Sequence, residues 1–315
     1  RLDEGISYLS FNLNFYKIIM SELKKNKKIT VEIVGGLGNQ IFCYAAGYAY
    51  AKRNNAILIQ DISFFKKPLY GREYNMHRFD INKNIISSSF YSVKFFRNIA
   101  YFFSKYFTFT GSVIENDPHK LESKFFLKMT GRKSKLYGYW QDERYFLDYR
   151  DILLEQLTLK KFTTHFNSNN KLLSSIRSED SVCIHYRSYS EVEIDNKNTD
   201  SIKLNKSYYI EAINQVLNKK KHPIFYLFGD EPSSEIEEML QDCHVVKVNW
   251  NVNKGDEIND LFLMSKCNTL VLANSSFSWW AGWLSSSNDV FFPEKNNLIY
   301  YPTPSSKWNI VQWKK

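Results

Sequence analysis

The sequence contains few cysteines and no long uninterrupted apolar run, and each shortage argues against a class of protein. Small secreted scaffolds rely on paired cysteines, whereas this chain of 315 residues has no C-x-x-C motif and four widely spaced cysteines: Cys43, Cys183, Cys243 and Cys267. We therefore expect reduced thiols, as in a cytosolic protein, and three of them lie in apolar runs where they are expected to pack as small core residues. No apolar run reaches the ~18 residues that a membrane-spanning helix needs, so no such helix is expected.

The charge balance is shifted toward basic residues. The chain has 42 lysines and arginines against 33 acidic residues, for a formal net charge of +9. Such a surplus favours anionic partners, namely nucleic acid, phosphorylated substrates or an acidic membrane surface, and charge alone does not choose among them. The first residues, RLDEGISYLSFNLNFYKII, are acidic early and lack a small-residue cleavage site, which does not indicate a signal peptide.

The order of apolar runs predicts an α/β protein with two domains. A β-rich run at 29–34, a glycine turn, a helical pattern at 39–53 and a strand at 56–61 form the start of a parallel sheet. The polar stretch 160–175 is interpreted as a linker. A second series follows it, with strands at 181–187, 223–230 and 269–274 and helices at 207–220, 259–267 and 275–286. We predict a lead segment at 1–28 and two domains, at 29–165 and 176–315, that face each other across a cleft.

Residues 86–113 combine many aromatic side chains with Lys94, Arg97 and Lys105. One interpretation is an interfacial helix whose rings enter the headgroup layer of an anionic membrane. The other, which we favour, is a helix that packs between the sheet and solvent.

Four strand ends carry residues that simple turns do not require. In open α/β sheets, ligands bind beyond the carboxyl ends of the strands. The unusual ends are Gly35–Gln40, His185–Arg187, Gly229–Glu231 and Asn274–Ser278. Their convergence predicts a ligand site at this edge.

The segment ANSSFSWWAGWL supplies a candidate anion site. Asn274 and three serines follow an apolar strand and precede a helix, where unpaired backbone N–H groups and the helix dipole hold phosphate. Simple capping by Ser275 or Ser276 explains a single serine as well, so both interpretations stay open. The tryptophans of the helix are expected to anchor the core: Trp279, Trp280 and Trp283.

Three polar residues lie at the ends of the strands SVCIHYR and PIFYLFGD. Arg187 requires an anionic partner, and its guanidinium matches a phosphate bidentately, although a salt bridge would satisfy it too. Asp230 is a candidate acceptor for hydrogen bonds from a nucleobase or ribose, while acidic residues are also common in turns. His185 is expected to be a hydrogen-bonded core residue rather than a catalytic one.

The glycine turn admits a rival interpretation. The stretch from Gly36 to Ile41 resembles the G-x-G-x-x-G fingerprint of NAD and FAD enzymes, and Asp61 stands where a ribose-binding acid belongs. However, Ile41 occupies the third position, where close packing of helix on strand favours glycine or alanine. The amides of Asn39 and Gln40 are not needed to bind a pyrophosphate. A dinucleotide site is therefore the weaker prediction.

Taken together, several segments resemble the glycosyltransferase family 11 α-1,2-fucosyltransferases: VGGLGNQIFCYAAGYA, REYNMHRF, GYWQDERYF, YYIEAI with PIFYLFGDE, and DLFLMSKCNTLVLANSSFSWWAGWL. The resemblance runs from about residue 29 to residue 295. It implies an α/β fold of the GT-B-like type, with two Rossmann-type domains. It also implies inverting transfer of L-fucose from GDP-L-fucose to the 2-hydroxyl of a β-linked galactose, with no metal or other cofactor.

The resemblance also implies roles for residues and partners. Gly36, Gly38 and Asn39 would shape the acceptor-side cleft near the sugar and diphosphate. Arg187 and the backbone amides of 276–278 would stabilise the leaving diphosphate. The acceptor would be a galactose-terminated glycan of a bacterial surface polysaccharide, carried on a lipid at the cytoplasmic face of the membrane, with no nucleic acid involved. The second domain would bind GDP through His185, Arg187, Asp230, Asn274, Ser275, Ser276, Phe277 and Ser278.

One departure from the family pattern leaves two questions open. The family has H-x-R-R-G-D-Y where this chain has HYRSYS at 185–190, so the second arginine and the acid are missing. The sequence does not say how the second phosphate is neutralised or which carboxylate deprotonates the acceptor. Candidates for the base lie just downstream: Glu191, Glu193 and Asp195. The alternative function is a non-catalytic relative that binds a nucleotide sugar or a glycan.

Overall fold

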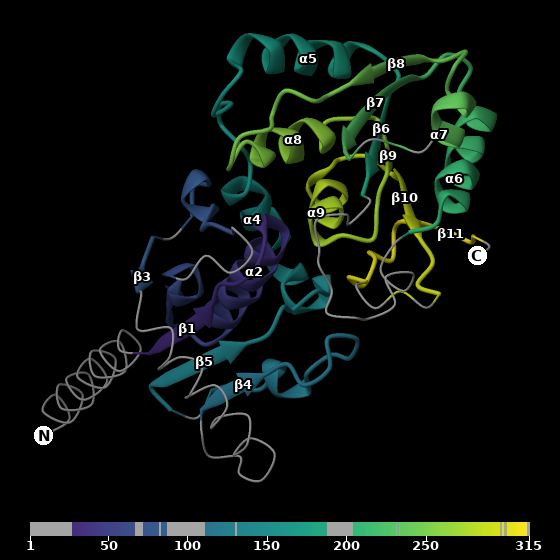
Figure 1. The fold of residues 1–315 in the computed structure, drawn as a ribbon. Coiled ribbons are helices and arrows are strands. Elements are labelled where there is room, and N and C mark those ends of the chain that lie inside the picture. The colour runs from purple at the N-terminus through teal and green to yellow at the C-terminus, as the bar shows by residue number, and fades with distance from the viewer. Residues whose placement is uncertain are drawn as a thin grey trace, which may run out of the picture.

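The computed structural model of the chain contains two parallel β-sheets with helices packed on them (Figure 1). It describes residues 27–66, 72–81, 83–86, 111–129, 131–187, 204–230, 232, 234–296, 298 and 301–313. Most of the predicted lead segment and nearly all of the aromatic segment 86–113 lie outside the described residues, so the predictions made for them stay predictions. Among the described helices, none is both long and apolar enough to cross a membrane.

The first sheet has the strand order β3-β2-β1-β5-β4, and its pairings are parallel. Its strands are β1 (Lys28–Glu32), β2 (Ile57–Asp61), β3 (Ile85–Ile86), β4 (Ser112–Ile114) and β5 (Lys133–Tyr137). Helix α2 (Leu37–Arg53) lies on one face, where Ile29 and Val31 are fully buried. The period of two in β1, with exposed Lys28 beside buried Ile29, is what a sheet with one covered face produces.

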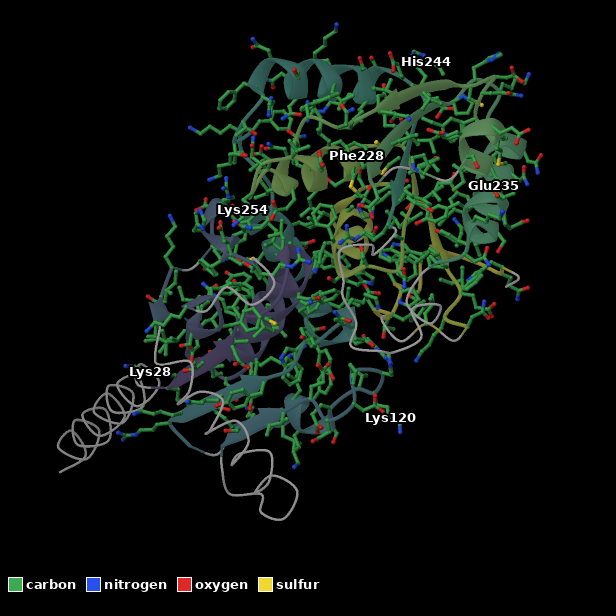
Figure 2. The ribbon with its side chains drawn as sticks, viewed as in Figure 1. Lys28, Lys120, Phe228, Glu235, His244 and Lys254 are labelled. Atoms are coloured by element: carbon green, nitrogen blue, oxygen red, sulfur yellow. The ribbon has the colours of Figure 1, made fainter. Side chains whose placement is uncertain are left out.

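The second sheet has the order β11-β10-β9-β6-β7-β8, and its pairings are also parallel. Its strands are β6 (Ser181–Tyr186), β7 (Ile224–Gly229), β8 (His244–Lys247), β9 (Thr269–Val271), β10 (Asp289–Pro293) and β11 (Asn309–Val311). The described residues of this half form helices α5 (Phe166–Ser178), α6 (Lys206–Lys219), α7 (Ser234–Met239), α8 (Glu257–Met264) and α9 (Ser276–Leu284). The central strands are continuous apolar runs because both of their faces are covered, and Phe228 lies deep inside this half (Figure 2).

Short helices connect the elements of the first half and lead to the second. They are η1 (Ser63–Lys66), η3 (Met76–Arg78), η4 (Ser123–Phe126), η5 (Glu143–Tyr145), η6 (Leu147–Tyr149) and α4 (Arg150–Gln156).

The interpretation of residues 160–175 as a linker is wrong from residue 166 onward. Helix α5 begins at Phe166 and buries a narrow stripe formed by Asn169, Leu172 and Ile176. The spacing of three and four residues places these side chains on one helical face. The polar composition of the segment concealed this stripe because only two of its three members are apolar.

The two halves pack together through helices α2 and α9. The ring of Phe42 on α2 lies 4.5 Å from the ring of Trp279, and Phe146 stacks on Trp280 at 5.4 Å. Arg150 donates to the carbonyl of Trp283 at 2.8 Å and places its guanidinium over the indole. All three tryptophans are at most 1% exposed, which confirms the expectation that they anchor the core.

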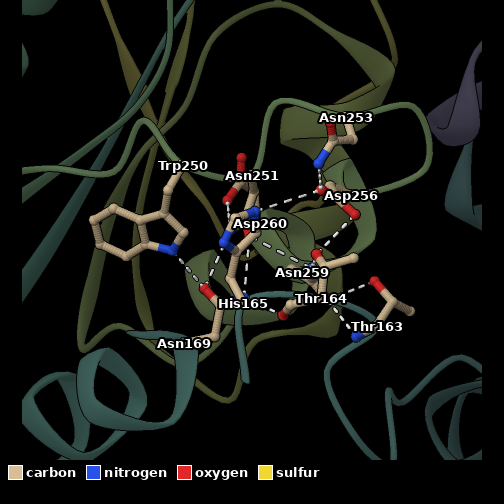
Figure 3. Close-up of polar contacts among 10 residues, drawn as sticks. All are labelled: Thr163, Thr164, His165, Asn169, Trp250, Asn251, Asn253, Asp256, Asn259 and Asp260. Atoms are coloured by element: carbon tan, nitrogen blue, oxygen red, sulfur yellow. Dashed lines mark hydrogen bonds and ion pairs between the residues drawn. The ribbon is translucent and has the colours of Figure 1, made fainter. Parts of the chain in front are cut away.

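A buried network of polar side chains fixes the segment that crosses from the first sheet to the second (Figure 3). Asn259 accepts a hydrogen bond from the backbone N–H of Thr163 at 3.0 Å, and Asp256 accepts one from the hydroxyl of Thr164 at 2.8 Å. In the same cluster Asn251 donates to Asp260 at 2.6 Å. These contacts join the crossing segment to helix α8 and so help to set how the two halves sit.

The network contains one carboxyl group whose ionisation is unfavourable. Burial raises the pKa of Asp260 to about 7, with the charges of Glu257 and Asp256 adding to the effect. Because the unfolded chain loses this proton at lower pH than the folded one, stability falls as pH rises from about 4 to about 7. We expect Asp260→Asn to remove this part of the pH dependence, which is on the order of 4 kcal/mol in the free energy of unfolding, because each pKa unit between the folded and unfolded values corresponds to about 1.4 kcal/mol.

Urea unfolding of the wild type and Asp260→Asn at pH 5 and pH 8 measures this difference. Asp242→Asn, at an exposed carboxylate, serves as the matched control and should unfold like the wild type at both pH values. An equal loss of stability between pH 5 and pH 8 in wild type and Asp260→Asn would contradict the prediction.

Candidate functional site

The starts of helices α2 and α9 meet at the carboxyl edges of the two sheets. A methyl carbon placed on Gly38 would lie 2.5 Å from both the backbone nitrogen of Phe277 and the carbonyl carbon of Ser276. Only a residue without a side chain permits this approach of one backbone to another. The glycine-rich turn of the first half and the serine-rich turn of the second therefore form one locus.

The glycine-rich turn is held by the buried side chain of Gln40. Its amide donates to the carbonyl of Gly35 at 3.0 Å and to the carbonyl of Glu73 at 2.7 Å, and its oxygen accepts the N–H of Asn75 at 2.9 Å. Gln40 was not among the predicted site residues, and no local pattern indicates its role because two of its partners lie more than thirty residues away. The predicted site residue Asn39 accepts a hydrogen bond from Gln141 at 2.8 Å.

The predicted residues at the start of α9 divide into internal and outward-facing groups. The hydroxyl of Ser275 accepts the backbone N–H of Ser278 at 3.1 Å, so Ser275 caps the helix. The hydroxyl of Ser278 is hydrogen-bonded to Nδ1 of His185 and accepts the N–H of Ala273 at 3.2 Å. Asn274 is also fully buried. Ser276 and Phe277 are partly exposed and adjoin Gly38.

His185 is a buried neutral ring in this arrangement. Burial, together with the nearby charge of Arg187, lowers the pKa of His185 to about 3. The prediction of a hydrogen-bonded core histidine is therefore confirmed. Through Ser278 it ties the end of strand β6 to the first turn of α9.

Arg187 and Asp230 follow the neighbouring strands β6 and β7 and form an ion pair, with 3.2 Å between Nη1 and Oδ1. Both side chains are about one-quarter exposed, at 22% and 26%. Gly229, just before the aspartate, has φ = +93°, a conformation that favours glycine. The salt-bridge alternative for Arg187 is thus realised, and the pair lies at the edge where the ligand site was predicted.

The three predicted base candidates, Glu191, Glu193 and Asp195, lie outside the described residues. Asp61, the candidate ribose-binding acid of the dinucleotide alternative, is buried at the end of β2 and accepts the N–H of Ser63 at 3.0 Å. Its carboxylate is thus engaged within the turn that follows the strand.

The electrostatics of the locus favour an anion. Neither α2 nor α9 has an acidic residue in its first turn, and the α2 N-terminus has no side-chain cap because Gly36 occupies that position. Two positive helix ends in contact repel each other, and an anion bound beside them would relieve this repulsion. The arrangement is chemically suited to a phosphate group.

Comparison with known proteins gives the family. The profile of "Glycosyl transferase family 11" matches residues 7–299. The chain belongs to this family. An α-1,2-colitosyltransferase of Escherichia coli is 28% identical over 272 residues, which cover 82% of this chain and 88% of that protein. The O-antigen biosynthesis glycosyltransferase WbnK of Escherichia coli is 24% identical over 299 residues, covering 83% and 92%.

Solved structures confirm the predicted GT-B-like fold of this family 11 member. FUT1 of Arabidopsis thaliana, solved with GDP, gives a TM-score of 0.50 at 14% identity and covers 87% of this chain and 72% of its own. The fucosyltransferase NodZ from Bradyrhizobium gives a TM-score of 0.50 at 12% identity, and the match covers 83% of this chain and 94% of NodZ. At this identity the likeness concerns the fold alone.

Proposed function

We propose that the protein transfers L-fucose from GDP-L-fucose to the 2-hydroxyl of a β-linked galactose, with inversion, in a unit of a bacterial surface polysaccharide such as an O-antigen. The observation that carries the proposal is the contact of Gly38 with the Ser276–Phe277 peptide, beside strand β6, which Arg187 follows directly. It brings two helix N-termini and a guanidinium to one edge, as a nucleoside diphosphate leaving group requires.

In this mechanism the acceptor hydroxyl attacks the anomeric carbon from the face opposite GDP, and the bond to the diphosphate oxygen breaks. Negative charge grows on the leaving diphosphate, where Arg187 and the amides of 276–278 would stabilise it. Neutral His185 adds no charge and holds the α9 turn through Ser278. Glu191, Glu193 and Asp195 remain the candidates for the base, which would add ~10²–10⁴-fold.

The reaction is proposed to need no metal, because cationic groups of the chain are proposed to meet the diphosphate. Transfer should then continue in excess EDTA, and strict dependence on manganese would overturn the metal-free part of the proposal.

The acceptor is proposed to be lipid-linked, with the protein in the bacterial cytoplasm at the inner face of the membrane.

A second donor is favoured by a specific observation, the 28% identity to an α-1,2-colitosyltransferase. Colitose is the 3-deoxy analogue of L-fucose, so the two donors differ by one hydroxyl group. A pocket that hydrogen-bonds this hydroxyl would reject the deoxy sugar strongly, whereas a pocket that does not would accept both.

The deciding assay incubates the full chain with GDP-L-fucose or GDP-colitose and a panel of β-galactosides that begins with lactose and Gal-β1,3-GalNAc. Linkage analysis of the product should show an α-1,2 bond. Faster transfer from GDP-colitose would mean that the proposed donor is wrong and that the proposed type of reaction is right. Binding of GDP in calorimetry without turnover on any acceptor would support the alternative of a non-catalytic relative.

A further inference from the structure

Arg72 lies against the N-terminus of α2. A methyl carbon placed on Gly36 would be 3.7 Å from Nη1, 3.8 Å from Cζ and 4.0 Å from Nε of this arginine. Three nearly equal distances mean that the flat face of the guanidinium covers Gly36, the N-cap residue of the helix. The edge of the guanidinium, which carries its N–H donors, therefore remains available to a ligand at the helix end.

The backbone that carries Arg72 is fixed to the same turn. Gln40 binds the carbonyl of Glu73 and the N–H of Asn75, which follow Arg72 directly in the chain. Asn75 in turn donates to Glu257 of helix α8 at 2.8 Å, and Lys254 pairs with Glu73 at 3.2 Å. The position of Arg72 is thus set by contacts with both halves of the molecule.

The two guanidinium groups near this locus, Arg72 and Arg187, differ in their acidic partners among the described residues. No carboxylate among the described residues pairs with Arg72, whose side chain is exposed. Arg187, by contrast, shares its charge with Asp230 at 3.2 Å. A diphosphate bound beside the α9 turn would meet one neutralised guanidinium and the helix ends, and a second cation would compensate its remaining charge.

We propose that Arg72, supplied by the first half of the molecule, binds the diphosphate of the nucleotide across the contact between α2 and α9. Arg72 would then neutralise the second phosphate, a role left open because the second arginine of the family pattern is missing from this chain. This inference rests on the proposed function, since it assumes a nucleoside diphosphate as the ligand. It makes Arg72 a donor-binding residue that acts on the phosphates and not on the base.

Calorimetric titration of the full chain with GDP and with guanosine tests the assignment. Arg72→Ala should raise the Kd for GDP about tenfold or more, because a hydrogen bond to a charged group is lost, and should leave the Kd for guanosine unchanged. Arg72→Lys keeps the positive charge but loses the forked arrangement of N–H donors, so its Kd for GDP should lie between those of the wild type and Arg72→Ala. The matched control is Arg132→Ala, an exposed arginine at the amino end of the same sheet, which should bind GDP like the wild type.

The outcomes separate this inference from the proposal on which it rests. If the wild type binds GDP and Arg72→Ala binds it equally well, the assignment of Arg72 is wrong and the proposed function stands. An equal loss of affinity for GDP and guanosine also overturns it, since the arginine then does not act on phosphate. If the wild type binds neither ligand, both the proposed function and this inference fail.

Discussion

Replacing Gly38 by alanine is expected to lower kcat/KM for sugar transfer by about a hundredfold. The added methyl group would lie 2.5 Å from backbone atoms of Ser276 and Phe277, and ordinary contact distances are about an ångström longer. Neither neighbour can move as a flexible side chain does, because the atoms belong to the first turn of α9. The two helix starts must separate, and a 1 Å misplacement of binding groups can cost ~10²-fold in rate.

A second glycine in the same helix provides the control. A methyl group on Gly47 would lie 2.7 Å from Cγ1 of Val31, inside the first half and away from α9. Gly47→Ala should therefore lower the free energy of unfolding by about 1–3 kcal/mol through overpacking, with kcat/KM of the folded fraction near that of the wild type.

Steady-state transfer kinetics and thermal unfolding of both variants distinguish a damaged site from a damaged fold. If Gly38→Ala transfers sugar at the wild-type rate, the contact between the two turns has no part in the reaction. If Gly47→Ala loses as much activity as Gly38→Ala, general destabilisation explains both losses, and the contact of Gly38 with α9 is not needed to explain them.

The alternation of strands and helices could be predicted from the sequence because it depends on local patterns. Continuous apolar runs marked the central strands, and a glycine turn marked the start of α2. The convergence of strand ends was also predictable, since β6, β7 and β9 are neighbours in a parallel sheet and their carboxyl ends share one edge. The capping role of Ser275 followed from the same local reasoning.

Contacts between distant segments could not be predicted. Nothing near Gln40 indicates that it binds residues 73 and 75, and nothing near Gly38 indicates a neighbour at position 276. The Gln40 contacts depend on how the first half folds. The Gly38 contact depends on how the two halves pack, which is set by the buried rings at α2 and α9. The same limit applies to Arg187, for which the sequence allowed either a phosphate or a salt bridge and the structure places Asp230 beside it.

Arg187→Ala is expected to lower kcat by ~10²–10³-fold, the usual effect of removing one donor that stabilises charge in a transition state. The fold should lose about 1 kcal/mol or less, because the pair with Asp230 is partly open to solvent. The two effects differ in size because the guanidinium is proposed to bind the diphosphate most tightly as the bond to the sugar breaks. Single-turnover transfer and urea unfolding measure them separately.

The partner of Arg187 requires its own control, since removing the arginine also exposes the negative charge of Asp230 to the nucleotide. The double variant Arg187→Ala with Asp230→Asn removes both charges. If it regains most of the wild-type rate, the loss in the single variant came from repulsion by Asp230. If it stays as slow, the guanidinium itself stabilises the leaving group, because neutralising its partner does not replace it. Arg144→Ala, which breaks the pair between an exposed arginine and the buried Asp142, should leave kcat unchanged in the same assay.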